Sequence, residues 1–308
     1  MTILALAAAV LYGTADFLGG LASRRASVFA VLALTVPAGA VVMLTAALLG
    51  GALGVGGSGP AGNWGAVGWA AASGICGTAG LIAFYAGFAT APISVVAPVA
   101  ALVSAVLPVG AAIAGGERPP GTVIAGGLVC LVAIVLVSVQ SADHAPSAGR
   151  ARAAGHVPPR GLRGLGDLGG SRRLLALGYG VAAGVGFGLF FLFLKDAGRS
   201  GVLWPVAVSR SAGAVVAFGL ALATRTRPWS VRRDVIRIAL VSGAIDAGAN
   251  VCYVLATRAG LFGLAVVITS LYPGMTVLLA RLLLGERMRW LQRAGLVLAA
   301  AGVLLVTL

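Results

Sequence analysis

The sequence predicts an all-α membrane protein with ten transmembrane helices, arranged as two inverted five-helix repeats. Its 308 residues are 59% hydrophobic and only 10% charged, whereas a soluble domain carries about 25% charged residues. The apolar runs are continuous and about twenty residues long, which is the length of a membrane-spanning helix. Transmembrane strands would instead give segments of about ten residues with alternating polarity. A repeat within the sequence, described below, supplies the inverted arrangement.

The first five predicted helices precede the first long polar stretch of the chain. Uninterrupted apolar windows place them near residues 2–22, 27–50, 64–88, 92–115 and 119–140. Five more follow, near residues 174–194, 202–223, 238–257, 261–284 and 290–308. The opening segment lacks the basic region of a cleavable signal peptide and contains Asp16, so we expect it to stay as a mature helix.

The polar stretch between the two groups is rich in Arg, Gly, Ala, Ser and Pro. This composition is typical of a flexible linker, because it offers little apolar surface to bury. We therefore predict a first five-helix repeat over residues 1–140, a linker over 141–173 and a second five-helix repeat over 174–308.

The two predicted repeats resemble each other at an offset of 169 positions. Gly116-Glu117-Arg118 then falls on Gly285-Glu286-Arg287, and Ser73-Gly74 falls on Ser242-Gly243. Because each repeat has an odd number of spans, the second must enter the membrane from the opposite side. Inverted repeats of this kind are common in transporters.

Basic residues are distributed unequally between the two sets of alternate loops. Most of the 22 lie on the side of the linker, and only Arg118, Lys195, Arg199 and Arg258 lie on the other. Cytoplasmic loops carry the excess of Lys and Arg, so we predict a cytoplasmic linker and both termini outside. The net charge of +14 therefore has a topological explanation, and nucleic acid is not an expected partner.

Four ionisable residues are predicted to lie at membrane depth: Asp16, Arg210, Asp246 and Arg281. Each costs about 2.5 to 3.5 kcal/mol on insertion scales, so each needs a reason. Their charges could cancel as two ion pairs, which would be a structural role. For the aspartates a functional role is equally open, because burial disfavours the charged form of a carboxyl and lets it exchange a proton with a substrate.

A polar stripe marks the predicted helix 238–257. Asn250 and Tyr253 follow Asp246 by four and seven residues, so the three side chains share one helix face. Such a stripe is expected to face a cavity, although hydrogen bonds to neighbouring helices would also explain it. Tyr85 in the third predicted helix is a weaker candidate of the same kind.

Prolines interrupt the predicted helices 92–115 and 261–284, in equivalent parts of the two repeats. The carbonyls freed by a proline must be satisfied by neighbours or line a wet cavity, which indicates a central site; a simple kink is the alternative. Thr269 and Tyr272 lie beside Pro273. The complete set of predicted substrate-binding residues is Asp246, Asn250, Tyr253, Asp16, Tyr85, Thr269 and Tyr272.

Other motifs indicate structure or exclude chemistry. Glu117 and Glu286 lie at the ends of predicted helices, where we expect each to cap the next helix or hold a short turn. The sequence contains no GxxxxGK[ST] nucleotide loop and no HExxH metal pair, and its two histidines lie in the linker. The three cysteines have no CxxC spacing. We therefore expect no cofactor, no metal site and no enzymatic activity.

Two segments carry a family resemblance: LYGTADFLGGLASRR over Leu11–Arg25 and ITSLYPGMTVLLARLLLGERMRWLQRAG over Ile268–Gly295. Through them the chain resembles the EamA-type exporters of the drug/metabolite transporter superfamily, over nearly its full length. The resemblance implies ten helices in two inverted repeats, a central cavity, and export of small metabolites or drugs without a cofactor. Smaller relatives couple transport to protons through a carboxylate in their first helix, where Asp16 lies here within a different motif.

The leading functional prediction is a secondary exporter in the cytoplasmic membrane, whose halves rock around a midplane cavity and which is driven by a proton or substrate gradient. A passive facilitator and a non-transporting scaffold or lipid-handling protein are the alternatives, since a fold does not name a function. The expected partners are a small-molecule substrate and membrane lipid. A homodimer is compatible with the sequence.

Overall fold

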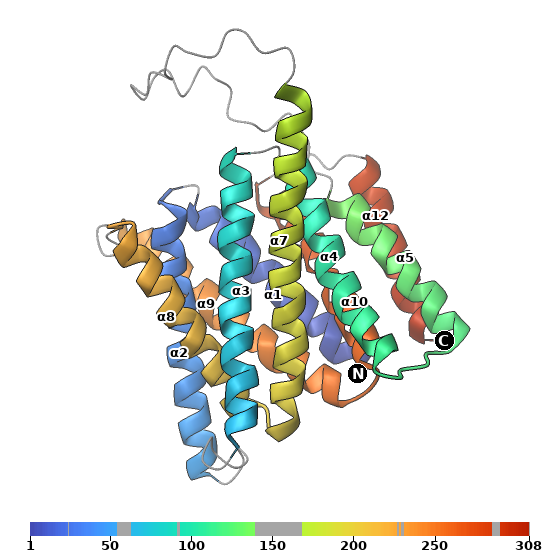
Figure 1. The fold of residues 1–308 in the computed structure, drawn as a ribbon, viewed down its shortest axis with the longest axis horizontal. Coiled ribbons are helices and arrows are strands. Elements are labelled where there is room, and N and C mark those ends of the chain that lie inside the picture. The colour runs from blue at the N-terminus through green and yellow to red at the C-terminus, as the bar shows by residue number, and fades with distance from the viewer. Residues whose placement is uncertain are drawn as a thin grey trace.

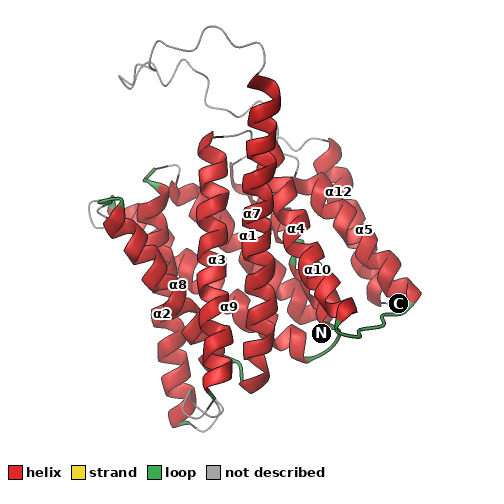
Figure 2. Cartoon of the chain, viewed as in Figure 1, coloured by secondary structure: helices red, strands yellow, loops and turns green. Residues whose placement is uncertain are grey.

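The computed structural model describes residues 1–23, 25–53, 63–90, 93–138, 168–226, 228, 231–284 and 290–307. The first half contains α1 (Thr2–Ser23), α2 (Val28–Ala52), α3 (Trp64–Thr90), α4 (Ile93–Ala114) and α5 (Gly121–Ser138). The second contains α7 (Leu168–Ala197), η2 (Gly198–Ser200), α8 (Leu203–Ala223), α9 (Arg233–Arg258), α10 (Phe262–Thr269), α11 (Tyr272–Leu284) and α12 (Trp290–Thr307). Within these ranges all regular secondary structure is helical (Figure 2), which confirms the all-α fold.

The predicted spans correspond to these helices, with one interruption and one extension. In the described ranges, seven segments are long and apolar enough to cross a membrane, and three shorter apolar helices accompany them. The ninth predicted helix is divided into α10 and α11 by a turn at Ser270 and Leu271. The helix α7 begins at Leu168, inside the predicted linker, because a helix can extend beyond its apolar run into water. Residues 141–167 of that linker lie outside the described residues.

Helices from the two halves of the chain interleave. The helix α3 packs on α7 and α8, and in the same way α9 packs on α1 and α2. The helix α4 packs on α7, while α10 and α11 pack on α1. The remaining large contacts pair α2 with α8 and α5 with α12, at opposite sides of the bundle (Figure 1). Every helix of one half thus finds its main partners in the other half.

Two close helix crossings involve the residues that match between the predicted repeats. At Gly74 of α3, an added Cβ would overlap the Ser209 carbonyl of α8, and at Gly243 of α9 it would overlap the Thr35 carbonyl of α2. Small residues permit such close approach, which replaces hydrophobic association in lipid. The preceding serine also bonds in each case, Ser73 Oγ to Ser209 Oγ at 2.9 Å and Ser242 Oγ to the Ala15 carbonyl at 2.8 Å.

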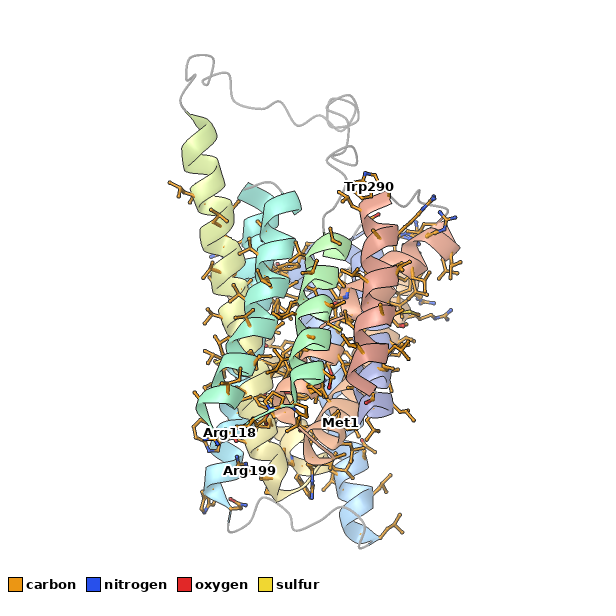
Figure 3. All side chains as sticks on the ribbon, turned by 90° about the vertical axis from the view of Figure 1, so that its right-hand side faces the viewer. Met1, Arg118, Arg199 and Trp290 are labelled. Atoms are coloured by element: carbon orange, nitrogen blue, oxygen red, sulfur yellow. The ribbon has the colours of Figure 1, made fainter. Side chains whose placement is uncertain are left out.

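The bundle has two ends, which we call the Met1 end and the Trp290 end. Figure 3 shows Met1, Arg118 and Arg199 at one end and Trp290 at the other. The turn between α9 and α10 belongs to the Met1 end, because Gly260 packs against Met1. At the Trp290 end, Arg25 after α1 forms a 3.1 Å ion pair with Asp234 at the start of α9.

Candidate functional site

The predicted polar stripe of α9 meets α1 inside the bundle. Tyr12 Oη donates a hydrogen bond of 3.0 Å to Asn250 Oδ1, and Asn250 Nδ2 donates one of 2.6 Å to the Asp246 carbonyl. Both Tyr12 and Asn250 are buried. The amide of Asn250 therefore ties α1 to the turn of α9 that carries Asp246.

The carboxylate of Asp246 forms an ion pair with Arg210 of α8. These side chains are only 21% and 13% exposed, respectively. Arg210 Nη2 also donates to the Asp246 carbonyl at 3.4 Å, whereas Arg210 Nε is buried with no hydrogen-bond partner among the described residues. One of the two ion pairs suggested by the sequence is thus present. Arg281 is exposed and forms no ion pair with any described residue.

Asp16 lies deep in the bundle, and yet its side chain is exposed. Ala9 and Tyr12 precede it by seven and four residues, so they share its helix face, and both are buried. The outer face of α1 is marked instead by Ile3 and Val10, which are 82% and 44% exposed. From this combination we infer that Asp16 faces an accessible gap between the helices, which we call the hollow.

Exposure along this part of α1 increases towards the Trp290 end. Gly20, one turn after Asp16, is exposed, and nothing lies within 4 Å of an added Cβ there. In the opposite direction, Ala5 and Ala8 have no exposed surface. We therefore infer that access to the hollow comes from the Trp290 end and stops at Asp16.

The charges around this hollow are unequal. The carboxylates of Asp16 and Asp246 repel each other electrostatically, and among the described residues Arg210 forms its ion pair with Asp246. Among the described residues Asp16 forms no hydrogen bond or ion pair through its side chain. Within the described part of the chain, the site thus presents one carboxylate, that of Asp16, without a counter-ion.

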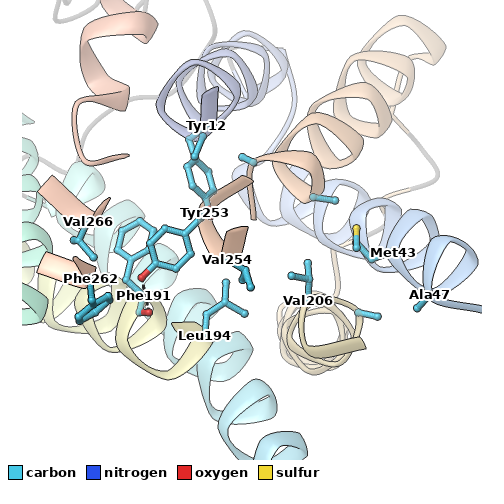
Figure 4. Close-up of a cluster of buried hydrophobic side chains, with 14 of the residues drawn as sticks. Tyr12, Met43, Ala47, Phe191, Leu194, Val206, Tyr253, Val254, Phe262 and Val266 are labelled. Carbon is cyan, nitrogen blue, oxygen red and sulfur yellow. Dashed lines mark hydrogen bonds between the residues drawn. The ribbon is translucent and has the colours of Figure 1, made fainter. Parts of the chain in front are cut away.

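An aromatic cluster of Tyr12, Phe191 and Tyr253 lies inside the bundle, on the side of Asp16 that faces the Met1 end (Figure 4). The ring of Phe191 on α7 lies 6.1 Å from that of Tyr12 and 4.9 Å from that of Tyr253, measured between centroids. Tyr253 Oη also donates a 2.7 Å hydrogen bond to the Phe191 carbonyl. Tyr253 has no exposed surface, so the structure places it in the packed core and not on an accessible wall.

The remaining predicted site residues lie in different surroundings. Thr269, at the break between α10 and α11, is fully buried, and its hydroxyl has no hydrogen-bond partner among the described residues; the same holds for the Ser270 hydroxyl. Tyr272 is partly buried, with its ring 6.3 Å from that of Tyr12. The side chain of Tyr85 lies outside the described residues.

Glu117 has a structural role, as expected, but it caps a different helix from the one that follows it. Its Oε1 and Oε2 accept hydrogen bonds of 2.8 and 3.1 Å from the backbone N–H groups of Phe262 and Gly263, the first residues of α10. It therefore caps a helix of the other half and not the helix that follows it. The reason is local: Gly116 adopts φ +95°, a left-handed conformation that suits glycine and turns the chain at the end of α4.

Comparison with known proteins supplies the family context of this geometry. Residues 174–308 match the EamA-like transporter family. The chain is also similar to a protein of known crystal structure, with a TM-score of 0.75 and 18% sequence identity over 99% of this chain and 96% of that one. At that identity the similarity establishes the fold alone. No curated protein sequence matches the chain.

Proposed function

We propose that this multi-pass membrane protein, whose residues 174–308 form an EamA-like transporter family domain, is a secondary exporter of a small metabolite or drug. The proposed mechanism is alternating access across the cytoplasmic membrane. The observation that carries the proposal is Asp16, an accessible carboxylate deep in the bundle that has no counter-ion among the described residues.

A hollow that is open at one end and closed at the other fits one state of an alternating-access cycle. At the Trp290 end the hollow admits a solute to Asp16, and towards the Met1 end the aromatic cluster and the Glu117 cap block its passage. Transporters place their sites near the midplane between inverted repeats and expose them to one side at a time. With the linker in the cytoplasm, the structure would represent the state that loads substrate for export.

Asp16 is the proposed coupling residue. A carboxylate inside a membrane protein is costly and commonly marks a proton or substrate pathway. Asp16 can be neutralised by a proton or by a positive group of the substrate, since Arg210 is already paired with Asp246. If the proton and the substrate compete for the Asp16 carboxylate, binding of a proton drives release of the substrate. Proton import and substrate export are then coupled.

The packing between helices of the two halves indicates which helices move together. Rocking of the two sequence halves would separate α3 and α4 from α7, and α9, α10 and α11 from α1, which are the large contacts of the bundle. We propose instead that the moving units are mixed bundles, one made of α3, α4 and α7 and the other of α1, α9, α10 and α11. Their contact between α4 and α10 closes the Met1 end in this state.

The first test is proton-dependent transport by Asp16→Asn. A thermal-shift screen with amino acids, nucleotide sugars, cationic drugs and lipid precursors would first identify a stabilising ligand, whose export is then measured in vesicles with and without a proton gradient. We expect Asp16→Asn to lose gradient-driven accumulation. The matched control is Asp234→Asn, which removes an aspartate from the exposed ion pairs at the start of α9 and should transport normally.

Two outcomes would contradict the proposal. Unchanged proton dependence in Asp16→Asn would remove the coupling role of this residue. Equal rates in both directions, without any proton dependence in the unmodified protein, would identify a passive facilitator instead of a secondary exporter.

A further inference from the structure

A cavity lies at the Met1 end, beyond the aromatic cluster of Tyr12, Phe191 and Tyr253 when the bundle is followed from Asp16. Its volume is about 390 Å³, within the range of roughly 300 to 1,000 Å³ that small-molecule sites occupy. The ends of α4, α7 and α9 and the start of α10 form its wall. The charged residues among its lining are Glu117, Lys195, Arg199 and Arg258.

Positive charge is concentrated in this cavity. Only four basic residues lie in the loops that the sequence assigns to this side, and three of them, Lys195, Arg199 and Arg258, line the cavity. The fourth, Arg118, is exposed at the same end and does not line it. An arrangement that served topology alone would not gather sparse charges around one opening.

Two of the three cations are held in place. Asp196 accepts ion pairs from Lys195 at 3.2 Å and from Arg199 at 3.3 Å. The Lys195 ammonium also lies 4.7 Å from the centroid of the Phe262 ring, a cation–π geometry. These contacts direct both cations to the cavity wall without neutralising both of them, because one carboxylate serves two positive groups.

The other charges leave a net positive cavity. Both oxygens of Glu117 are occupied by the amides of Phe262 and Gly263, so its negative charge is directed at the α10 N-terminus, where it compensates the helix dipole. Arg258 is exposed and forms no ion pair with any residue that the structure describes. An unpaired guanidinium offers a fork of donors that matches a carboxylate or phosphate group.

We propose that this cavity binds the anionic group, carboxylate or phosphate, of a small molecule, with Arg258 as the principal contact and Lys195 and Arg199 in support. This inference rests on the proposed function in one respect: the cavity lies at the Met1 end, where an exported solute would emerge. The same chemistry would also accept the phosphate of a lipid headgroup.

The test uses the full-length protein in an uncharged detergent, with inorganic phosphate as the probe and chloride salt to hold ionic strength constant. A ligand that binds the folded state raises the melting temperature with increasing concentration. We expect a saturable phosphate response in the unmodified protein, and an apparent affinity weakened about tenfold or more in Arg258→Gln, because a hydrogen bond to a charged group is lost. Arg118→Gln, the matched control, should respond normally.

Arg258 is unpaired, so Arg258→Gln should melt normally without phosphate. If it does not, Thr257→Asp provides an independent variant, which places a carboxylate on the cavity lining and should also weaken the phosphate response. An unchanged response in both variants, or no saturable response in the unmodified protein, would overturn the proposal.

Two further arms separate the sources of the anion and the two proposals. Phosphate should compete with the exported solute in vesicles of phosphatidylcholine alone if the solute supplies the anion, whereas phosphatidylglycerol in the vesicles should suppress the phosphate response if lipid supplies it. Phosphate binding is measured without transport. A response that persists in Asp16→Asn therefore shows that the cavity functions independently of the coupling residue.

Discussion

At the scale of single residues, the ion pair between Arg210 and Asp246 determines what a substitution at Asp246 would mean. Removing one partner of a mostly buried ion pair leaves the other charge uncompensated, at a cost of about 3 to 5 kcal/mol. Both side chains retain some exposure, so the lower end of this range applies. We expect Asp246→Asn to lower the free energy of unfolding by about 3 kcal/mol and to melt at a lower temperature. Loss of transport in Asp246→Asn would then not identify a proton carrier.

The double variant Arg210→Gln with Asp246→Asn provides the control for this prediction. It removes both charges together, so it should recover part of the melting temperature that Asp246→Asn loses. Asp234→Asn removes an exposed aspartate and should have little effect on melting. A melting temperature that falls further in the double variant than in Asp246→Asn would contradict the role assigned to the pair.

Single residues also show what helical spacing in the sequence can and cannot predict. The intervals from Asp246 to Asn250 and Tyr253 correctly placed the three on one helix face, but they do not reveal which neighbour covers each turn. Asp246 forms an ion pair with Arg210. Tyr253 donates a hydrogen bond to the Phe191 carbonyl and is buried. Asp16 was predictable as a candidate because of its charge, whereas its exposure depends on the gap left by other helices.

At the scale of helices, the glycines at the crossings provide the most direct prediction. Gly74→Ala and Gly243→Ala each add a Cβ that overlaps a backbone carbonyl of the facing helix, so the helices must separate. We expect both variants to fold with much lower yield and to melt earlier. Gly219→Ala in α8 is the matched control, because nothing lies within 4 Å of its added Cβ and alanine favours helix.

Yields and melting temperatures of the three variants, measured in one detergent, test this expectation. If Gly74→Ala melted like Gly219→Ala, the close crossing of α3 and α8 would be refuted. Similar decreases in yield and melting temperature for Gly74→Ala and Gly243→Ala would support the inverted repeat, because these positions correspond at the 169-residue offset. The repeat and its boundaries stay predictions until such a test.

The same scale separates what the sequence could predict about helices from what it could not. Length and hydropathy located the spans, because membrane thickness fixes both. Pro273 indicated an interruption of this helix, but it did not predict the exact position of the turn between α10 and α11. The partner of Glu117 carried no signal, since a residue in one half caps a helix 145 positions later, and contacts between distant segments leave no periodic pattern in a single chain.

At the scale of the whole molecule, access to the interior from each end distinguishes a transporter in one state from a static scaffold. Gly20 and Ala9 lie eleven residues apart on the inner face of α1, the first exposed and the second buried. In a variant without Cys76, Cys130 and Cys252, Gly20→Cys should react with a membrane-impermeant thiol reagent added at the Trp290 end. Ala9→Cys should stay unreactive from either end while the Met1 end is closed.

Opening of the Met1 end should reverse that pattern. Glu117→Ala removes the acceptor of the Phe262 and Gly263 amides, which weakens the contact between α4 and α10. We therefore expect Ala9→Cys to become reactive from the Met1 end when combined with Glu117→Ala, and Gly20→Cys to react more slowly. In a scaffold with one stable conformation, Glu117→Ala would make Ala9→Cys reactive without slowing the reaction of Gly20→Cys. Only a shift in population between two conformations, each open at one end, changes the reactivity of both ends in opposite directions.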